Sequence, residues 1–281
     1  MRSPWRIAAA VLVLVLVAGI GVGFGWHSRE PRVGGKTLGE WLEQYYASST
    51  PGDLFRGGTG TTMNPAESSA ARQAILKIGT NGIPALLARV RSVDSPTHVR
   101  ILEIVHRVPW IPLKLSSAET RRNRADWGFA LLGEDGPTAV PELTALLSDP
   151  DPNVRGTAAR CLGHIGAPAE SAIPVMLRLL SERDQGIAIP SVMDGLAEIR
   201  LRPDLVVPVM IEFIHGDRTS WNYSLPALQV LRAYGSNAAP AVPAIQAFLL
   251  AHPDGGRQYL ALNALERIDP AAAKHVQALS P

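Results

Sequence analysis

Residues 149–166 read DPDPNVRGTAARCLGHIG, and the spacing of residue types in this stretch decides the fold. Asp151 or Asn153 can serve as an N-cap, because a side-chain oxygen there accepts a backbone N–H of the first helical turn. Small and apolar residues then follow at intervals of three, one and three, at Ala158, Cys161, Leu162 and Ile165. This spacing places them on one face of a helix. Gly166 ends the pattern, as a left-handed C-cap does.

The same pattern occurs six times along the chain. The reference column that contains Gly166 has steps of 54, 33, 34, 35 and 34 residues, and it consists of Gly79, Gly133, Gly166, Arg200, Gly235 and Asp269. Since Arg200 and Asp269 are not glycine, we expect those two helices to close differently. Eight residues after the column, the four central units carry Pro141, Pro174, Pro208 and Pro243, which favour the start of a second helix. A period near 34 predicts an all-α fold, an α-solenoid of about six helical hairpins over residues 67–281.

One column of the repeat consists almost entirely of small residues. It lies five residues before the reference column and contains Ala74, Gly128, Cys161, Gly195, Val230 and Ala264. Small side chains on a buried helix face allow a neighbouring helix to approach closely. This position predicts that Cys161 is a packing residue, since a buried thiol has a raised pKa and is inert as a nucleophile.

Residues 149–166 resemble the HEAT-like repeat of phycobilisome-lyase-type HEAT proteins, whose pattern is D-x-x-V-R-x-x-A-x-x-A-L-G-x-I-G. Arg155 matches the arginine of that repeat. The resemblance implies a HEAT-repeat, armadillo-like helical protein over roughly residues 68–281. HEAT arrays serve many roles, so the resemblance leaves two functions open. One is a non-catalytic protein–protein interaction scaffold; the alternative is an accessory or lyase-like protein that acts on another protein's prosthetic group.

The N-terminus predicts a membrane anchor. Residues 7–25 read IAAAVLVLVLVAGIGVGFG and carry no charge, while Arg2 and Arg6 lie in the preceding segment 1–6. Nineteen residues of helix nearly span a bilayer core. The arginines place residues 1–6 in the cytoplasm, so we expect a single-pass protein of the cytoplasmic (inner) membrane, with its solenoid on the periplasmic or extracytoplasmic side of the bacterial cell envelope. The alternative is a cleaved signal peptide and a secreted protein.

Three segments separate this anchor from the repeats. Residues 26–36 read as a polar linker and 37–47 as an N-terminal capping helix, where Thr37 and Glu40 have the spacing of a capping box. Residues 48–66 are rich in Gly, Ser, Thr and Pro and predict a flexible loop. The piece RGGTGTT in that loop lacks the lysine of a phosphate-binding loop, so we expect no nucleotide site.

The step between Gly79 and Gly133 is too long for one repeat, which predicts an insertion near 91–124. Within it, residues 95–108 predict an extra helix, and Ser116 or Ser117 can cap the helix that follows. Residues 86–124 also carry a net charge of +5. One interpretation is contact with anionic lipid or an acidic partner near 86–124; the other is a set of ordinary solvated helix faces. Residues 27–281 have no net charge, which argues against nucleic acid as a partner.

The sequence carries no recognisable motif for catalysis, for a cofactor or for a metal, and we therefore expect no enzyme and no cofactor. We expect a protein partner instead, of an identity that the sequence does not specify. Its contacts are predicted on exposed positions of the second helices, near Glu142, Arg178, Glu212 and Gln246. Candidate partner-binding residues in the insertion and in the loop before Ala227 are Arg107, Trp110, Arg121, Arg122, Arg124, Trp221 and Tyr223.

Overall fold

The computed structural model describes residues 30–49, 65–107, 116–181, 188–215, 223–252 and 255–279. These residues are mostly helical, and they include a short hairpin formed by β1 (Arg32–Val33) and β2 (Lys36–Thr37). The helices that follow are α2 (Leu38–Ser49), α3 (Pro65–Ile78), α4 (Ile83–Val90), α5 (Pro96–Arg107), α6 (Ala118–Leu132), α7 (Val140–Leu146), α8 (Pro152–Ile165), α9 (Ile173–Ser181), α10 (Ala188–Ile199), α11 (Pro203–His215), α12 (Ser224–Tyr234), α13 (Val242–Ala251), α14 (Gly255–Ile268) and α15 (Pro270–Leu279).

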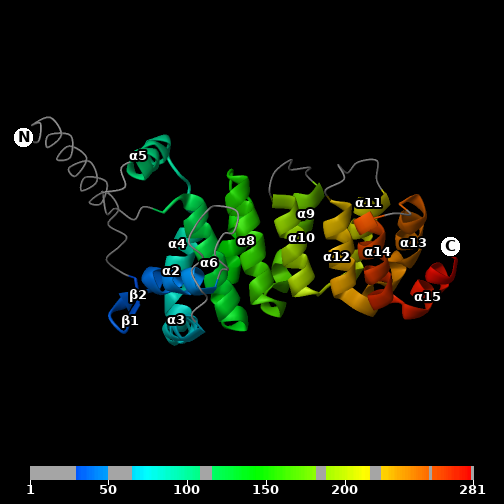
Figure 1. The fold of residues 1–281 in the computed structure, drawn as a ribbon, viewed down its shortest axis with the longest axis horizontal. Helices are drawn as coiled ribbons and strands as arrows, with labels where there is room; N and C mark the ends of the chain where they lie inside the picture. Colours follow the sequence, from blue (N-terminus) through cyan, green and yellow to red (C-terminus); the bar gives the residue numbers. More distant parts are fainter. Residues whose placement is uncertain are drawn as a thin grey trace, which may run out of the picture.

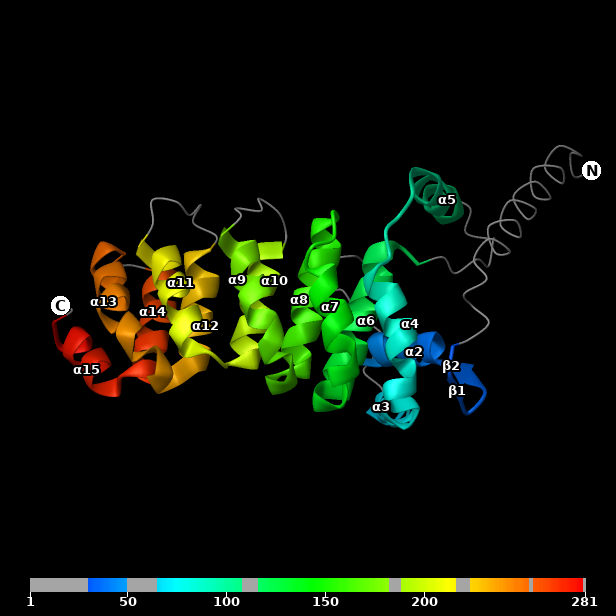
Figure 2. The ribbon, with the colours of Figure 1, turned by 180° about the vertical axis from the view of Figure 1, so that it is seen from behind.

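The helices stack as consecutive hairpins in one elongated row, as expected for an α-solenoid (Figure 1). The first helices α6, α8, α10, α12 and α14 form one layer, and the second helices α4, α7, α9, α11 and α13 form the other, with α3 and α15 at the two ends of the row (Figure 2). In the described part of the chain, no helix combines the length and hydropathy needed to cross a bilayer. The predicted anchor at residues 7–25 lies outside the described residues.

The repeat columns form the core, which confirms the predicted register. Six apolar residues four positions before the reference column have at most 1% of their surface exposed, and they are Ile75, Phe129, Leu162, Leu196, Leu231 and Leu265. The glycines of the reference column adopt positive φ angles, including 73° at Gly166, which glycine reaches without strain. The ψ angles of Gly133, Gly166 and Gly235 are −130°, −136° and −136°, so these caps differ from the left-handed helical cap that the sequence predicted. Arg200 shares the positive φ, at 53°, but no 3-10 turn follows it as one follows each of the four glycines, so its unit does close differently, as predicted.

Asp269 does depart from the glycine column, as predicted. Its backbone N–H continues the helical pattern by donating to Leu265 O at 2.7 Å. Its carboxylate then accepts hydrogen bonds from the N–H groups of Ala271 and Ala272, both at 3.0 Å. The side chain therefore caps α15, and the chain passes from one helix to the next without a glycine.

Three of the four column prolines begin a second helix, as expected. Pro141, Pro174 and Pro243 are each the second residue of α7, α9 and α13. Pro208 is the exception, because it lies inside α11, which already begins at Pro203. In that unit Pro203 occupies the first turn, where a missing N–H costs nothing, and the interior Pro208 leaves one backbone carbonyl without its helical donor.

The N-terminal end of the row is covered by α2 and the β1–β2 hairpin, where the sequence predicted only a linker before the capping helix. The capping box is present: Thr37 N–H donates to the Glu40 carboxylate at 2.7 Å, and Glu40 N–H donates to Thr37 Oγ1 at 3.3 Å. Leu38 and Leu42 are 1% exposed and belong to the same core as the repeats. The predicted cap is thus part of the folded body; its continuation into residues 50–64 lies outside the described residues.

Gly195 of the small-residue column lies where α8 and α10 approach closely, opposite Gly163 and Ala159 of α8. A Cβ atom added to Gly163 would lie 2.7 Å from the Cα of Gly195, and one added to Gly195 would overlap the carbonyl oxygen of Ala159. Cys161 lies in the same column and is fully buried. The glycines are therefore required for close approach of two neighbouring first helices.

The predicted extra helix is α5, and it lies outside both layers (Figures 1 and 2). It is joined to α4 by the segment that contains Ser92 and Asp94. Ser117 caps the helix that follows, α6, by accepting the N–H of Thr120 at 3.1 Å. Of the two serines that the sequence offered as caps, Ser117 is the one used.

Candidate interaction surface

The candidate residues predicted from the sequence are scattered over the structure. Trp110 and Trp221 lie outside the described residues, and Arg107 lies in α5 with an undescribed side chain. Tyr223 is half-buried and packs edge-on against Phe213 of α11, with ring centroids 6.4 Å apart. Its ring thus belongs to the packing of the stack, and its predicted role in partner binding stays a prediction.

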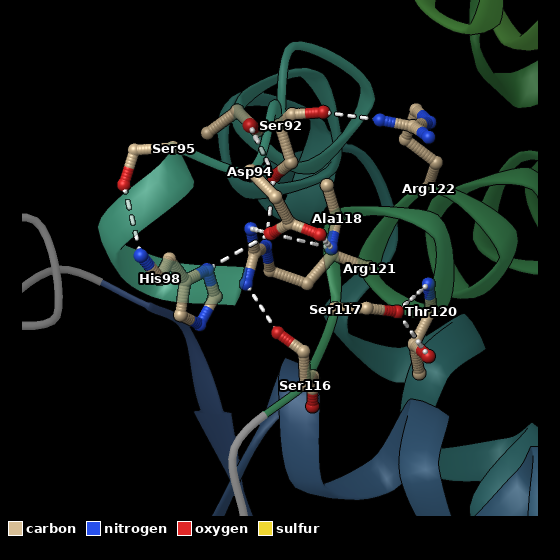
Figure 3. A network of polar contacts seen from close by, with 11 residues as sticks. Ser92, Asp94, Ser95, His98, Ser116, Ser117, Ala118, Thr120, Arg121 and Arg122 are labelled. Carbon is tan, nitrogen blue, oxygen red and sulfur yellow. Dashed lines mark hydrogen bonds and ion pairs between the residues drawn. The ribbon is translucent and has the colours of Figure 1, made fainter. Parts of the chain in front are cut away.

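Arg121 belongs to an internal cluster centred on Asp94 (Figure 3). The Asp94 carboxylate accepts the N–H of Ala118 with both oxygens, at 2.9 and 2.8 Å, and lies 3.1 Å from Arg121 Nη2 and 2.9 Å from His98 Nδ1. Arg121 also donates to Ser92 Oγ. Burial alone would raise the pKa of Asp94, but the Ala118 N–H and Arg121 outweigh it and lower that pKa. The cluster fixes the two ends of the insertion to each other.

The other arginines of the basic segment are also engaged within the protein. Arg122 is 8% exposed and donates to the carbonyl oxygen of Ser92. Arg124 donates to Ser116 Oγ at 3.2 Å and lies 3.9 Å from the Glu43 carboxylate. Two further ion pairs join Arg89 to Glu30 and Arg91 to Glu142. Most of the excess positive charge in 86–124 is therefore compensated by internal contacts, and the predicted role of these arginines in binding remains without direct support.

A row of charged side chains connects three consecutive first helices. Asp126 of α6 lies 3.1 Å from Arg160 Nε and 3.2 Å from His164 Nε2, both in α8. The other ring nitrogen of His164, Nδ1, lies 2.8 Å from the Glu198 carboxylate of α10. Arg160 also donates to Ser191 Oγ of α10 at 2.9 Å. We call these side chains, with Asp194 of α10, the charged row.

The electrostatics of the row favour a protonated His164. Burial alone would lower the pKa of its ring, but hydrogen bonds to Asp126 and Glu198 outweigh burial and raise it to about 9. Conversely, His164 and Arg160 overcome the effect of burial on Asp126 and lower its pKa. The pKa of Asp194 is raised, first by burial and then by the neighbouring carboxylates. The row thus holds two cations against three carboxyl groups.

Beside the charged row lies an aromatic pair in which Trp127 is exposed and Tyr45 is half-buried. Trp127 of α6 is 39% exposed, and its ring meets Tyr45 of α2 edge-on, with centroids 5.9 Å apart. Trp127, Arg160 and Asp194 occupy equivalent positions, each six residues before the reference column of its own unit. Because equivalent positions of stacked repeats lie on the same side, these three residues form one strip across α6, α8 and α10.

The row has the geometry of a structural network more than that of a catalytic site. Both nitrogens of His164 are bound by carboxylates, so neither is available to move a proton to or from a substrate. The thiol of Cys161 is fully buried, and burial raises its pKa well above the usual range. Across the described ranges, no group of three His, Cys, Asp or Glu side chains is placed to hold a metal ion.

The opposite layer carries the positions predicted from the sequence. Arg178 is exposed on α9 and lines a surface pocket of about 430 Å³ between α9 and the turn before α8, with Val175, Leu179 and Arg155. Glu142 is committed to Arg91, while Glu212 is exposed and Gln246 half-buried. The structure does not gather these four side chains into one site.

Residues 113–193 match the family model of HEAT repeats. The match covers α6 to the middle of α10, and therefore most of the charged row; it supports a HEAT-repeat protein and gives no support to the lyase type in particular. No curated protein matches the chain. Among solved structures, the crystal structure of an engineered protein from the Northeast Structural Genomics Consortium is 18% identical and covers 83% of this chain and 96% of its own. The TM-score between the two structures is 0.40.

The sequence interpretation missed the charged row and Trp127. It compared the apolar and small-residue columns of the repeat and did not compare the columns that face solvent. The column six residues before the reference position holds Gln73, Trp127, Arg160, Asp194, Gln229 and Asn263. Five of these six residues are polar, and Trp127 is the exception. An apolar residue in a polar column is a signal that the sequence itself contained.

Proposed function

We propose that this chain is a non-catalytic protein–protein interaction scaffold of the cell envelope, anchored in the cytoplasmic membrane by residues 7–25. HEAT repeats commonly serve as scaffolds for protein–protein interactions, and the helical stack and the match over residues 113–193 support this class. The anchor rests on the sequence of residues 7–25. We place the solenoid on the periplasmic or extracytoplasmic side, because Arg2 and Arg6 precede the apolar segment.

The observation that carries the proposal is the strip of Trp127, Arg160 and Asp194. Tryptophan and arginine are enriched where protein partners bind, and a large ring that is 39% exposed retains apolar surface for a partner to cover. The side chains of the strip are also held in place, Trp127 by Tyr45 and Arg160 by Asp126 and Ser191. Such fixed side chains lose little conformational entropy on binding. We therefore place the partner on the side of α6, α8 and α10 instead of on the second helices.

A binding comparison between two aromatic substitutions tests this placement. Full-length protein in mild detergent is used to recover its partner from solubilised membranes, and the partner's affinity is then measured with Trp127→Ala and with Tyr259→Ala. Tyr259 lies on α14, away from the strip, and is 67% exposed. We expect W127A to weaken binding at least about tenfold and Y259A to leave it unchanged. Equal affinities of the two variants, with unchanged circular dichroism, would place the partner elsewhere.

The topology is tested separately. A reporter that is active only outside the cytoplasm, fused after Pro281, should be active, and the mature protein should keep residues 1–25 when its intact mass is measured. A mass that lacks these residues indicates cleavage and a secreted protein. A reporter that works only in the cytoplasm would refute the proposed orientation.

A further inference from the structure

The surface formed by α6, α8 and α10 exposes its carboxylates more than its cations. The side chain of Glu198 is 47% exposed, and Asp194 is also exposed. The side chains of Arg160 and His164 are only 27% and 21% exposed. Both cations are also held by the carboxylate of Asp126, at 3.1 and 3.2 Å. A partner that approaches this surface therefore meets carboxylates before it meets a positive charge.

Asp194 is the least compensated carboxylate of the charged row. Across the described ranges it forms neither a hydrogen bond nor an ion pair, whereas Glu198 lies 2.8 Å from His164 Nδ1. Burial raises the pKa of Asp194 most, and two neighbouring carboxylates raise it further against the attraction of Arg160. With both cations and all three carboxylates charged, the row carries one negative charge in excess. The α10 end of the row is thus the place where an additional positive charge is favoured.

Trp127 and Asp194 mark the two ends of this surface. They occupy equivalent positions in α6 and α10, and α8 lies between these two helices in the same layer (Figure 1). Packed helices lie about 8–10 Å apart, so the two positions are separated by about 16–20 Å. Glu198 follows Asp194 by one helical turn and lies on the same face of α10. An extended chain covers about 20 Å in six residues, and side chains six residues apart point to the same side, so one partner segment can contact both ends.

We propose that the partner of this surface is a protein segment that places a basic side chain against Asp194 and Glu198 and an apolar side chain against Trp127. The inference rests on the proposed scaffold function and names the chemistry of its partner. Surfaces that bind each other have complementary potentials, and an acidic segment would meet like charges at α10. An arginine or lysine of the partner gives Asp194 the ion pair that it lacks within the described protein, and an apolar side chain covers the exposed ring of Trp127.

Synthetic peptides of defined charge test this chemistry. Three fluorescent peptides of glycine and serine each carry one leucine and, six residues later, an arginine, a glutamine or a glutamate. Their binding to the full-length protein in a nonionic detergent is measured by fluorescence anisotropy. We expect the arginine peptide to bind at least about tenfold more tightly than the glutamate peptide, with the glutamine peptide between them.

Two variants locate the charge that causes this preference. Asp194→Asn removes a carboxylate that has no hydrogen bond or ion pair among the described residues, so it should keep the fold and reduce the preference for arginine to less than about threefold. The control is Glu212→Gln, which removes an exposed carboxylate from α11 in the other layer and should leave the preference unchanged. Circular dichroism checks that both variants are folded.

The outcomes separate the chemistry of the partner from the position of the surface. If all three peptides bind equally and Trp127→Ala weakens each of them, the surface is correct and the basic partner is wrong. A preference for arginine that Asp194→Asn and Glu212→Gln reduce equally reflects overall charge, and it also overturns the inference. If no peptide binds, or if Trp127→Ala and Tyr259→Ala bind the peptides alike, the partner surface itself is misplaced, and the basic partner is refuted with it.

Discussion

Removing the positive charge of His164 should weaken the link between three neighbouring repeats. The ring lies between Asp126 and Glu198, 3.2 and 2.8 Å from their carboxylates, and its side chain is 21% exposed. These contacts raise the pKa of His164 from its ordinary value of 6.5 to about 9. Because the folded-state pKa is the higher one, protonation stabilises the fold fully below pH 6.5, and this contribution is lost as pH rises through about 9.

The size of the effect follows from the two pKa values. A change from 6.5 to about 9 corresponds to roughly 3 kcal/mol of preference for the protonated folded state. Since part of the ring faces water, solvent screening reduces this figure, and we expect a loss of about 2 kcal/mol between pH 6.5 and 9.5. That is a large fraction of the stability of an ordinary domain, so it lies well within the range of a denaturation measurement.

The assay is urea unfolding of the full chain in mild detergent, followed by circular dichroism at 222 nm at several pH values. His164→Gln removes the charge and should make the midpoint much less dependent on pH in this window, while lowering it at pH 6.5; the dependence that remains comes from the buried thiol of Cys161, whose pKa burial raises. The control is His252→Gln. His252 follows α13, near the C-terminal end of the helical stack, where it stacks on Phe248 and contacts no member of the charged row. If the wild type and H164Q lose stability in parallel between pH 6.5 and 9.5, the charged row does not hold His164 protonated.

Three further predictions test other parts of the structure. Gly195→Ala should lower the free energy of unfolding by about 2–3 kcal/mol in urea, because the new methyl group would overlap α8. The control is Gly256→Ala, whose methyl group meets open space and should lower that free energy by less than about 0.5 kcal/mol. Asp94→Asn removes the charge that binds Arg121 and the start of α6, so it should increase the rate of cleavage by a nonspecific protease between α4 and α6 at least about tenfold. An unchanged cleavage rate would show that the Asp94 cluster does not hold the two ends of the insertion together. The buried thiol of Cys161 should react with Ellman's reagent only upon unfolding, and rapid reaction of the native protein would contradict its burial.

The repeat columns predicted the fold because they reflect local chemistry. Ile75, Phe129 and the equivalent apolar residues are buried where their helical spacing placed them, and glycine ends four of the first helices at positive φ. Thr37 and Glu40 form the capping box that their spacing predicted. These features depend on residues within one or two helical turns, which is the range over which a sequence pattern specifies geometry.

The errors occurred where a tertiary or neighbouring contact overrides the local pattern. Arg200 has a positive φ although it is not glycine, which the sequence pattern did not predict. The start of α11 moved from Pro208 to Pro203 because a second proline five residues earlier was available for the first turn. Both positions are in the same unit of the repeat.

The sequence by itself determined the periodic stack, the buried columns and the small-residue contact between first helices, because each is a property of one helix repeated at a constant interval. Only the tertiary structure decided how the charges are used. Arg121 and Asp94 are separated by a whole helix, and Asp126, His164 and Glu198 lie in three different repeats, yet each group meets within about 3 Å. Ion pairs between distant segments depend on how helices pack, and no local spacing in the chain records them.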